Sequence, residues 1–304
     1  MTVAGSTPSS GGARSITATA FAKLTLSLRV RGLRPDGFHE LEALTVSVGA
    51  PVDQLRLVEA PTHSEPAVSV SGPYATGVPV DDTNLAVRAL RAACDAAGST
   101  VGCSVHLHKG IAPAAGLGGG SADAAAALLA ARALLALPLS DANLATLGAT
   151  LGSDVPFCLG SGPAWMRGRG EVIEPVDVGI DLAVVIAVPP FGCSTPAVYR
   201  AWDELGGPAA ARRVPMPGSA AEVIAELRND LEPAAERVQP RLADFRTAVE
   251  AATGVSAVLA GSGAAYALVC EHLDDAERHQ RELRGAGIEA HLGGVVAGGV
   301  ELTR

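Results

Sequence analysis

Aromatic residues are scarce in this 304-residue chain, where Phe, Trp and Tyr together make up only 3% of the sequence. Apolar residues nevertheless reach 48%, a share typical of a globular protein with a buried core. We therefore expect a core built mainly from Ala, Val and Leu. An aromatic side chain in a polar stretch stands out against this background and is a candidate for ligand contact.

Cysteine pairs with the spacing of a metal or redox site are also missing. No two cysteines form a C-x-x-C motif, and their number is odd. We expect buried free thiols, as in proteins of a reducing compartment. The five cysteines are Cys94, Cys103, Cys158, Cys193 and Cys270.

Basic side chains are too few, and too scattered, for a nucleic-acid-binding stripe. The chain has 23 Lys and Arg against 32 Asp and Glu, which gives a formal net charge of −9. Nucleic acid is therefore not an expected partner. A phosphate ligand is compatible with this charge, because backbone N–H groups hold phosphates without net positive charge.

Apolar runs long enough to cross a membrane are lacking as well. The alanine-rich run from Ala122 to Leu137 is interrupted by Asp123 and Arg132. Residues 1–14 are rich in Gly, Ser and Thr and have neither the basic nor the apolar region of a signal peptide. We expect a disordered tail over residues 1–14, a cytoplasmic protein and no membrane partner.

Alternating polarity predicts a half-buried strand over residues 20–30, with Lys23 and Thr25 on its polar face. Residues 34–37, Arg-Pro-Asp-Gly, are typical of a turn. A second apolar segment follows at residues 44–48. Together these segments predict a long hairpin.

The next part of the chain predicts a strand, a glycine-rich loop and a helix in that order. Polar residues 81–84 precede an alanine-rich run and predict a helix start. Residues 101–107 alternate as in a strand, and residues 122–135 are nearly all strong helix formers. The glycine-rich loop lies between these last two segments.

The C-terminal part has the pattern of an antiparallel sheet with helices. Residues 182–188 form a continuous apolar run, and residues 194–202 predict a helix with proline in its first turn. Residues 255–292 predict strand, loop, strand, helix and strand. Because residues 163–175 are polar and broken by glycine, we place a boundary near residue 176. The prediction is an α+β protein with an N-terminal domain over 15–176 and a C-terminal domain over 177–304.

The glycine-rich loop, Gly116 to Ser121, is the strongest chemical signal. Four glycines in five positions let the backbone approach a ligand closely. The free N–H groups at the start of the following helix favour an anion. We expect Ser121 to cap this helix and to offer its hydroxyl to a phosphate or a metal.

Three interpretations of this loop compete. A Walker A loop requires Lys and then Ser or Thr after the last glycine, and Ser121-Ala122 does not fit. A dinucleotide-binding fingerprint fits in part, with Asp141 at the distance of a ribose partner but Ser121 in place of the third glycine. A turn that serves packing alone is disfavoured by the entropic cost of so many glycines.

A third class of phosphate loop matches better. Residues 116–125, Gly-Leu-Gly-Gly-Gly-Ser-Ala-Asp-Ala-Ala, resemble the phosphate loop of GHMP kinases. Within these kinases the chain is most similar to the family that phosphorylates 4-diphosphocytidyl-2-C-methyl-D-erythritol. Further segments agree in order over nearly the whole chain after residue 15: Ala22–Leu24, Arg34–Leu41, Asn84–Leu85, Leu151–Phe157, Asn229–Glu232 and Gly261–Gly263.

The resemblance implies a two-domain GHMP kinase fold with the active site in the cleft between the domains. It implies ATP as phosphate donor, Mg²⁺ with it, and a cytidylyl alcohol phosphorylated on its 2-hydroxyl in non-mevalonate isoprenoid synthesis. Because phosphoryl transfer needs alignment, charge neutralisation and a proton acceptor, Asp154 is the candidate base and Lys23 its partner. Metal ligands are not identified, and we expect a monomer or weak homodimer.

The resemblance also assigns binding residues. The ATP side is expected to be formed by Asn84, Leu85, Lys109, Ala115, Gly116, Leu117, Gly118, Gly119, Gly120, Ser121, Ala122 and Asp123. Phe38 and His39 match an aromatic–His pair that clamps cytosine. The substrate side is expected to be formed by Thr25, Phe38, His39, Thr195, Pro196, Tyr199, Gly261, Ser262 and Gly263.

Three departures from the family pattern leave alternatives open. Thr25 replaces an Asn, Phe38 replaces a Tyr, and the proline before the glycine loop is shifted to Pro113. A GHMP kinase for a different alcohol, a weakly catalytic nucleotide-binding paralogue and a nicotinamide enzyme are the alternatives. Lys23 and Asp154 argue against the paralogue, and Ser121 argues against the nicotinamide enzyme.

Overall fold

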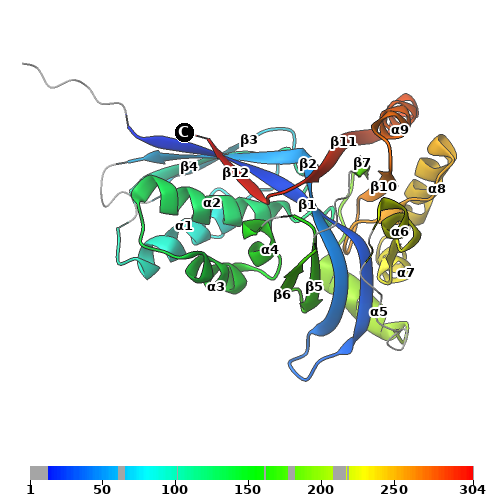
Figure 1. The fold of residues 1–304 in the computed structure, drawn as a ribbon, viewed down its shortest axis with the longest axis horizontal. Coiled ribbons are helices and arrows are strands. Elements are labelled where there is room, and N and C mark those ends of the chain that lie inside the picture. Colours follow the sequence, from blue (N-terminus) through cyan, green and yellow to red (C-terminus); the bar gives the residue numbers. More distant parts are fainter. Residues whose placement is uncertain are drawn as a thin grey trace, which may run out of the picture.

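A computed structural model of the chain describes residues 13–60, 66–100, 102–160, 162–176, 182–207, 217 and 219–303 (Figure 1). Most of the predicted tail, residues 1–12, lies outside the described residues. So do residues 177–181, which follow the predicted domain boundary, and residues 208–216 of a predicted loop.

A long antiparallel hairpin runs through the molecule and confirms the predicted strand pair. It consists of β1 (Ser15–Leu33) and β2 (His39–Glu59) (Figure 1). At its turn the N–H of Gly37 donates to the carbonyl of Arg34 at 3.0 Å, and Gly37 has a φ of +83°. The Pro-Asp-Gly signal therefore identifies the turn correctly, and the turn places Phe38 and His39 at the start of β2.

The middle of β1 differs from the predicted half-buried strand. Thr25 and Ser27 are as buried as the leucines between and around them, because β1 is an interior strand covered on both faces. A bulge also interrupts the alternation: Thr25 pairs with Thr45 and Ser27 with Leu44, which leaves Leu26 without an opposite residue. After this bulge, Leu28 lines the same cavity as Lys23.

Four helices pack together beside the hairpin and build the N-terminal half. They are α1 (Leu85–Ala96), α2 (Gly119–Leu135), α3 (Asp141–Leu151) and α4 (Val155–Leu159) (Figure 1). The strands of this half that flank the hairpin are β3 (Val68–Ser71), β4 (Cys103–His108), β5 (Ala164–Gly168) and β6 (Val172–Pro175).

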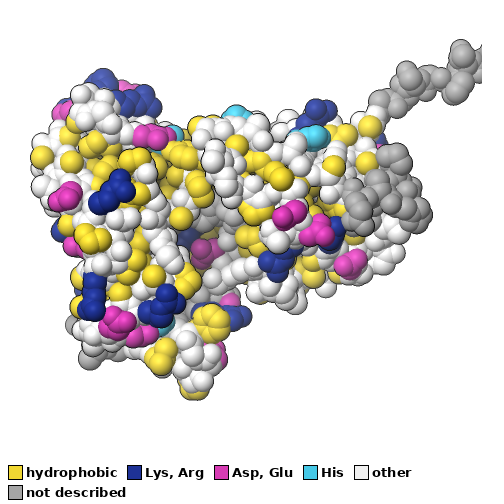
Figure 2. All heavy atoms as spheres, turned by 180° about the vertical axis from the view of Figure 1, so that it is seen from behind, with side chains coloured by type: hydrophobic (Ala, Val, Ile, Leu, Met, Phe, Trp, Pro, Cys, Tyr) yellow, Lys and Arg dark blue, Asp and Glu magenta, His cyan; other side chains and the backbone are white. Residues whose placement is uncertain are grey.

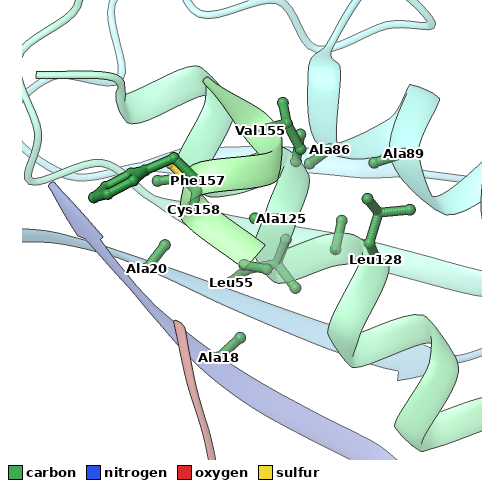
Figure 3. Close-up of a cluster of buried hydrophobic side chains, with 14 of the residues drawn as sticks. Ala18, Ala20, Leu55, Ala86, Ala89, Ala125, Leu128, Val155, Phe157 and Cys158 are labelled. Atoms are coloured by element: carbon green, nitrogen blue, oxygen red, sulfur yellow. The ribbon is translucent and has the colours of Figure 1, made fainter. Parts of the chain in front are cut away.

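Small side chains dominate the core of this half, as the composition predicts. Ala18 and Ala20 of β1, Ala86 of α1 and Ala125 of α2 belong to one cluster that also contains Leu55 and Leu128 (Figure 3). Alanine lets helices and sheet approach closely without voids. The close packing of α2 on β1 and β2 holds the glycine loop next to Lys23.

The C-terminal half is an antiparallel sheet with helices on it, as predicted. Its strands are β7 (Ala183–Val188), β9 (Val258–Leu259), β10 (Tyr266–Cys270) and β11 (Glu289–Val296). Its helices are α5 (Thr195–Glu204), α6 (Ala220–Ala225), α7 (Glu232–Val238), α8 (Arg241–Thr253) and α9 (Leu273–Gly285). Every residue of β7 is buried, which confirms the prediction from its continuous apolar run.

Three strands from the later part of the chain join the two halves. β11 pairs with β7 along most of its length and with Val48 and Ser47 of β2 at its end. β12 (Val300–Thr303) and the short β8 (Arg228–Asn229) both pair with β1. The halves therefore share hydrogen-bonded strands, and the division at residue 176 stays a prediction.

One local expectation is wrong. Helix α2 begins at Gly119 with Gly118 as its left-handed N-cap, so Ser121 lies inside the first turn and does not cap the helix. Residues 163–175, next to the predicted boundary, form the hairpin β5–β6, with Gly168 and Gly170 at its turn in positive-φ conformations. Among the helices that the structure describes, none has the length and apolarity needed to cross a bilayer.

Candidate active site

A cavity of about 740 Å³ brings together segments that are far apart in the sequence. Its walls come from β1, the start of β2, the glycine loop, the residues before α4, the β5–β6 turn, α5 and the loop at Gly261. The surface is hollowed between the two halves, with acidic and basic side chains in the hollow (Figure 2). This volume suits a small-molecule ligand.

The glycine loop turns sharply into helix α2 at one end of the cavity. The first intrahelical bond runs from the N–H of Ala122 to the carbonyl of Gly118 at 2.9 Å. The N–H groups of Gly119, Gly120 and Ser121 have no partner among the described residues, and all three residues line the cavity. Their free donors and the positive end of α2 fit a phosphate group.

At two positions of the loop, neighbouring atoms leave no room for a Cβ, so glycine is required there. A Cβ on Gly118 would lie 2.6 Å from Cγ of Lys23, and one on Gly116 would lie 1.8 Å from the carbonyl oxygen of Ala260. The N–H of Lys23 donates to the carbonyl of Leu117 at 3.0 Å. The loop is therefore fitted to β1 on one side and to the loop at Ala260 on the other.

Lys23 and Asp154 meet in this cavity from different elements. Nζ of Lys23 lies 3.3 Å from Oδ2 of Asp154, and their side chains are 12% and 31% exposed. Asp154 precedes α4, but its side chain makes no capping hydrogen bond to that helix. Its carboxylate therefore faces the lysine and the cavity, where it can orient a hydroxyl group and accept its proton.

Aromatic and imidazole rings gather at the end of the cavity near the hairpin turn. The imidazole of His39 stacks on Tyr199 with ring centroids 4.8 Å apart, and Nε2 of His39 lies 2.7 Å from Oδ1 of Asp203. The ring of Phe38 is half exposed and lies 4.9 Å below the guanidinium of Arg169. Burial raises the pKa of the Tyr199 hydroxyl, which therefore stays neutral.

A buried ion cluster lies behind the glycine loop. Nζ of Lys109 donates to Asp53 and, at 2.5 Å, to Asp123 of α2. Asp53 also accepts the N–H groups of Gly110 and Ile111, each at 2.8 Å. Burial and the charge of Asp53 raise the pKa of Asp123 to about 7, against the opposing effect of Lys109. The cluster ties the start of α2 to β2.

Most residues predicted for the site line this cavity: Lys23, Phe38, His39, Leu85, Ala115, Gly116, Leu117, Gly118, Gly119, Gly120, Ser121, Asp154, Thr195, Pro196, Tyr199, Gly261 and Ser262. The hydroxyl oxygens of Thr195 and Ser262 are 2.6 Å apart, so they join two walls.

Six predicted residues do not line it. Thr25 is buried, with its hydroxyl 3.5 Å from that of Thr45, and Asn84 caps α1 by accepting the N–H of Ala86. Lys109 and Asp123 belong to the buried ion cluster. The remaining two, which adjoin lining residues, are Ala122 and Gly263.

Sequence reasoning missed three charged residues of the cavity wall: Arg169, Arg200 and Asp203. A signal exists for each. Arg169 is flanked by Gly168 and Gly170, which is unusual for a residue in a polar linker. Arg200 and Asp203 follow Pro196 and Tyr199, respectively, at a spacing of four residues, which puts each pair on one face of α5.

No group of three or more His, Cys, Asp or Glu side chains within the described ranges is arranged to hold a metal ion. Mg²⁺ does not require such a cage, because it is commonly held by one or two carboxylates together with substrate phosphates.

Comparison with known proteins agrees with this geometry. The model of the GHMP kinase N-terminal domain matches residues 84–162, and that of the GHMP kinase C-terminal domain matches residues 208–289. A crystal structure of homoserine kinase from Cytophaga hutchinsonii, at 18% identity, covers 95% of this chain and 97% of its own with a TM-score of 0.72, which shows the shared fold.

The chain therefore belongs to the GHMP kinase family, and this membership implies ATP as its phosphate donor. Among its relatives are proteins named 4-diphosphocytidyl-2-C-methyl-D-erythritol kinase. The one from Cutibacterium acnes is 40% identical over 82% of this chain and 83% of its own length, and the one from Streptomyces avermitilis is 38% identical over 90% and 94%. A crystal structure of 4-(cytidine 5′-diphospho)-2C-methyl-D-erythritol kinase is 34% identical, covers 93% of this chain and 100% of its own, and has a TM-score of 0.75.

Proposed function

We propose that this protein transfers the γ-phosphate of ATP to the 2-hydroxyl of 4-diphosphocytidyl-2-C-methyl-D-erythritol, a step of non-mevalonate isoprenoid precursor synthesis. The relatives that cover most of the chain act on the substrate in their name. The observation that carries the proposal is the cavity itself, because one continuous space joins the glycine loop, the Lys23–Asp154 pair and the rings near the hairpin turn.

The ATP phosphates would bind at Gly116–Ser121, where free N–H groups of α2 face the cavity. Leu85 lines the same wall of the cavity beside Gly120, in keeping with a place near the nucleoside. Mg²⁺ would accompany the phosphates and neutralise their charge, with the Ser121 hydroxyl as a nearby oxygen.

Lys23 and Asp154 would serve the acceptor hydroxyl. Asp154 would orient this hydroxyl and take its proton, and Lys23, held 3.3 Å away, would keep the carboxylate in place and stabilise the charge that develops on the transferred phosphate. Both side chains are positioned before the substrate arrives, which lowers the entropic cost of alignment.

The cytidine would bind at the far end of the cavity. Phe38 offers a half-exposed ring for stacking, and Tyr199 and Pro196 of α5 line the same cavity. Thr25 is buried beside Thr45, its partner on β2, and outside the cavity lining, so its departure from the family residue does not change the surface that a substrate meets. We further propose a cytoplasmic location, no nucleic-acid partner and a monomer or weak homodimer.

A coupled assay of ADP release across a panel of alcohols tests the proposal. The panel contains the cytidylyl alcohol, its uridylyl analogue, homoserine and mevalonate. We expect turnover with the cytidylyl alcohol, and a kcat/KM at least tenfold lower with the others. Turnover confined to another alcohol would leave a GHMP kinase with a different substrate.

A further inference from the structure

Charged side chains in the cavity fall into two groups. Lys23 and Asp154 form an ion pair, and Asp203 is bonded to His39. Arg169 and Arg200 also line the cavity, yet within the described ranges neither guanidinium has an ion pair or a hydrogen bond. Two guanidinium groups of the cavity wall are therefore without a direct ionic or hydrogen-bonding partner among the described residues.

Arginines elsewhere in the described chain are mostly neutralised. Arg167, on the same hairpin as Arg169, lies 2.6 Å from Glu174, and Arg29 lies 2.6 Å from Glu226. The carboxylate of Asp36 interacts electrostatically with Arg169, but it forms its ion pair with Arg34, at 3.2 Å. In a chain with a net charge of −9, two unpaired arginines in one cavity are an arrangement that an anionic ligand would complete.

Arg169 is held firmly in place at the cavity wall. Its backbone N–H donates to Glu171 at 2.6 Å, and the turn glycines on both sides have positive φ. Its guanidinium covers the ring of Phe38 at 4.9 Å, next to the proposed cytosine site. A planar guanidinium anchored in this way keeps its N–H groups free for an oxyanion.

Arg200 comes from the wall formed by helix α5. It follows Tyr199 directly and lies one turn after Pro196, both of which line the cavity. Its side chain is exposed, so it remains hydrated until a ligand arrives. The two arginines thus lie on separate elements, the β5–β6 turn and α5, at the end of the cavity that holds Phe38 and Tyr199.

We propose that Arg169 and Arg200 bind the diphosphate that links the cytidine of the substrate to its alcohol. The inference rests on the proposed function and adds the residues that recognise the charged middle of the substrate. A diphosphate diester carries two negative charges between the base and the reacting hydroxyl. Two arginines can bind its oxygens through charge-assisted hydrogen bonds. These residues would act on substrate binding and not on the transfer step.

The test uses the full chain and the variants Arg169→Gln, Arg200→Gln and the double variant. Arg88→Gln serves as the control, because Arg88 is exposed on α1 outside the cavity lining. Calorimetry measures the binding of cytidine 5′-diphosphate and of cytidine, with a saturating non-hydrolysable ATP analogue that blocks the ATP site. Steady-state kinetics give the KM of the cytidylyl alcohol and of ATP.

We expect each Gln variant to weaken binding of cytidine 5′-diphosphate by about tenfold, the worth of one charge-assisted hydrogen bond. Cytidine binding, kcat and the KM of ATP should stay within about twofold, and the KM of the cytidylyl alcohol should rise with the diphosphate effect. Arg169→Lys should restore much of the affinity because it keeps the charge. Arg88→Gln should match the wild type.

Two outcomes overturn the inference while the proposed function stands. One is a double variant that binds cytidine 5′-diphosphate as the wild type does. The other is an equal loss for cytidine and its diphosphate, which would mean that the arginines only support the base site. A wild type that neither turns over the cytidylyl alcohol nor binds cytidine overturns the proposed function and this inference together.

Discussion

At the scale of single residues, Asp154 stands at a helix-capping position, but its side chain pairs with Lys23 in the cavity instead. An aspartate before Val155-Pro156 is well placed to cap helix α4, yet its carboxylate makes no such bond and lies 3.3 Å from Nζ of Lys23. The helix is thus left without a side-chain cap, and the lysine gains an anionic partner inside the cavity. This arrangement favours a role in proton transfer over a role in helix stability.

Replacement of Asp154 by Asn tests this role. The change keeps the shape of the side chain and removes its charge, so kcat should fall by roughly 10²–10⁴-fold, the usual worth of a positioned base. The dissociation constant of ATP should stay within about threefold, because the glycine loop is untouched. Steady-state turnover and ATP titration measure the two quantities.

The matched control is Asp95→Asn, since Asp95 is exposed on α1 and far from the cavity lining. It should turn over as the wild type does. If Asp154→Asn retained near-normal kcat, the proton of the acceptor hydroxyl would have to leave by another route.

At the scale of elements, the glycine loop is fitted to β1 through Gly118. This residue has a φ of +68°, and a Cβ on it would lie 2.6 Å from Cγ of Lys23. Gly118→Ala should therefore displace the lysine and lower kcat by roughly tenfold or more, because small misplacements of catalytic groups are costly. Turnover at saturating substrate measures the effect.

Gly254→Ala separates backbone strain from displacement of Lys23. Gly254 ends α8 with a φ of +72° and open space around its Cβ position. Both variants should lower stability by about 1 kcal/mol through left-handed backbone strain. Only the Gly118 variant should lose activity, and equal kcat in the two variants would refute the proposed fit between loop and lysine.

The ion cluster behind the loop predicts a specific pH dependence of stability. Because the pKa of Asp123 is raised to about 7 in the folded protein, the folded state keeps a proton that the unfolded chain loses near pH 4. The contribution of this group to the free energy of unfolding is present below pH 4 and declines as the pH rises to about 7. Asn at this position cannot ionise. The free energy of unfolding of Asp123→Asn, relative to that of the wild type, should therefore be higher at pH 8 than at pH 4.5.

Urea unfolding of both proteins at the two pH values checks this expectation. Asp95→Asn again serves as the control and should show no such change, since its side chain is exposed. A stability difference between Asp123→Asn and wild type that is the same at both pH values would contradict the raised pKa.

Elements with strong local signals could be predicted from the sequence. The turn at residues 34–37, the start of α1 after Asn84 and the apolar run of β7 all depend on neighbouring residues. The start of α2 could not be predicted in the same way. Lys23 packs so closely against position 118 that only glycine fits there. This glycine is the left-handed N-cap, so the helix begins at Gly119, before Ser121.

The candidate site was predictable to the extent that its residues lie in contiguous motifs. Gly116–Ser121, Phe38, His39 and Asp154 are such residues, and the cavity brings them together. Arg169 and Arg200 were missed because their meaning depends on the absence of partners in three dimensions. The burial of Lys109 was missed because its partner Asp53 is 56 residues away in the sequence.

At the scale of the whole molecule, the two halves are joined by hydrogen-bonded strands. β11 pairs with both β2 and β7, and β12 closes on β1 (Figure 1). The halves should therefore unfold in one cooperative transition. Each half carries one buried tryptophan, Trp165 in β5 and Trp202 in α5, and each belongs to a hydrophobic cluster that also contains side chains of the other half.

Single-tryptophan variants test this cooperativity. Trp202→Phe leaves Trp165 of β5 as the fluorescence probe, and Trp165→Phe leaves Trp202 of α5. In each variant, the urea midpoint from fluorescence should coincide with that from far-UV circular dichroism. Fluorescence transitions that precede or follow the loss of secondary structure would show that the halves unfold independently.

The proposed reaction in this cavity moves a phosphate from ATP to the 2-hydroxyl of a cytidylyl alcohol. Its most direct test is a ³¹P NMR measurement on wild-type protein with ATP, Mg²⁺ and 4-diphosphocytidyl-2-C-methyl-D-erythritol. We expect loss of the ATP γ-phosphate signal and the growth of one phosphomonoester signal assigned to the 2-position, with the diphosphate signals of the substrate retained. Release of inorganic phosphate without a new ester, or an ester at another position, would contradict it.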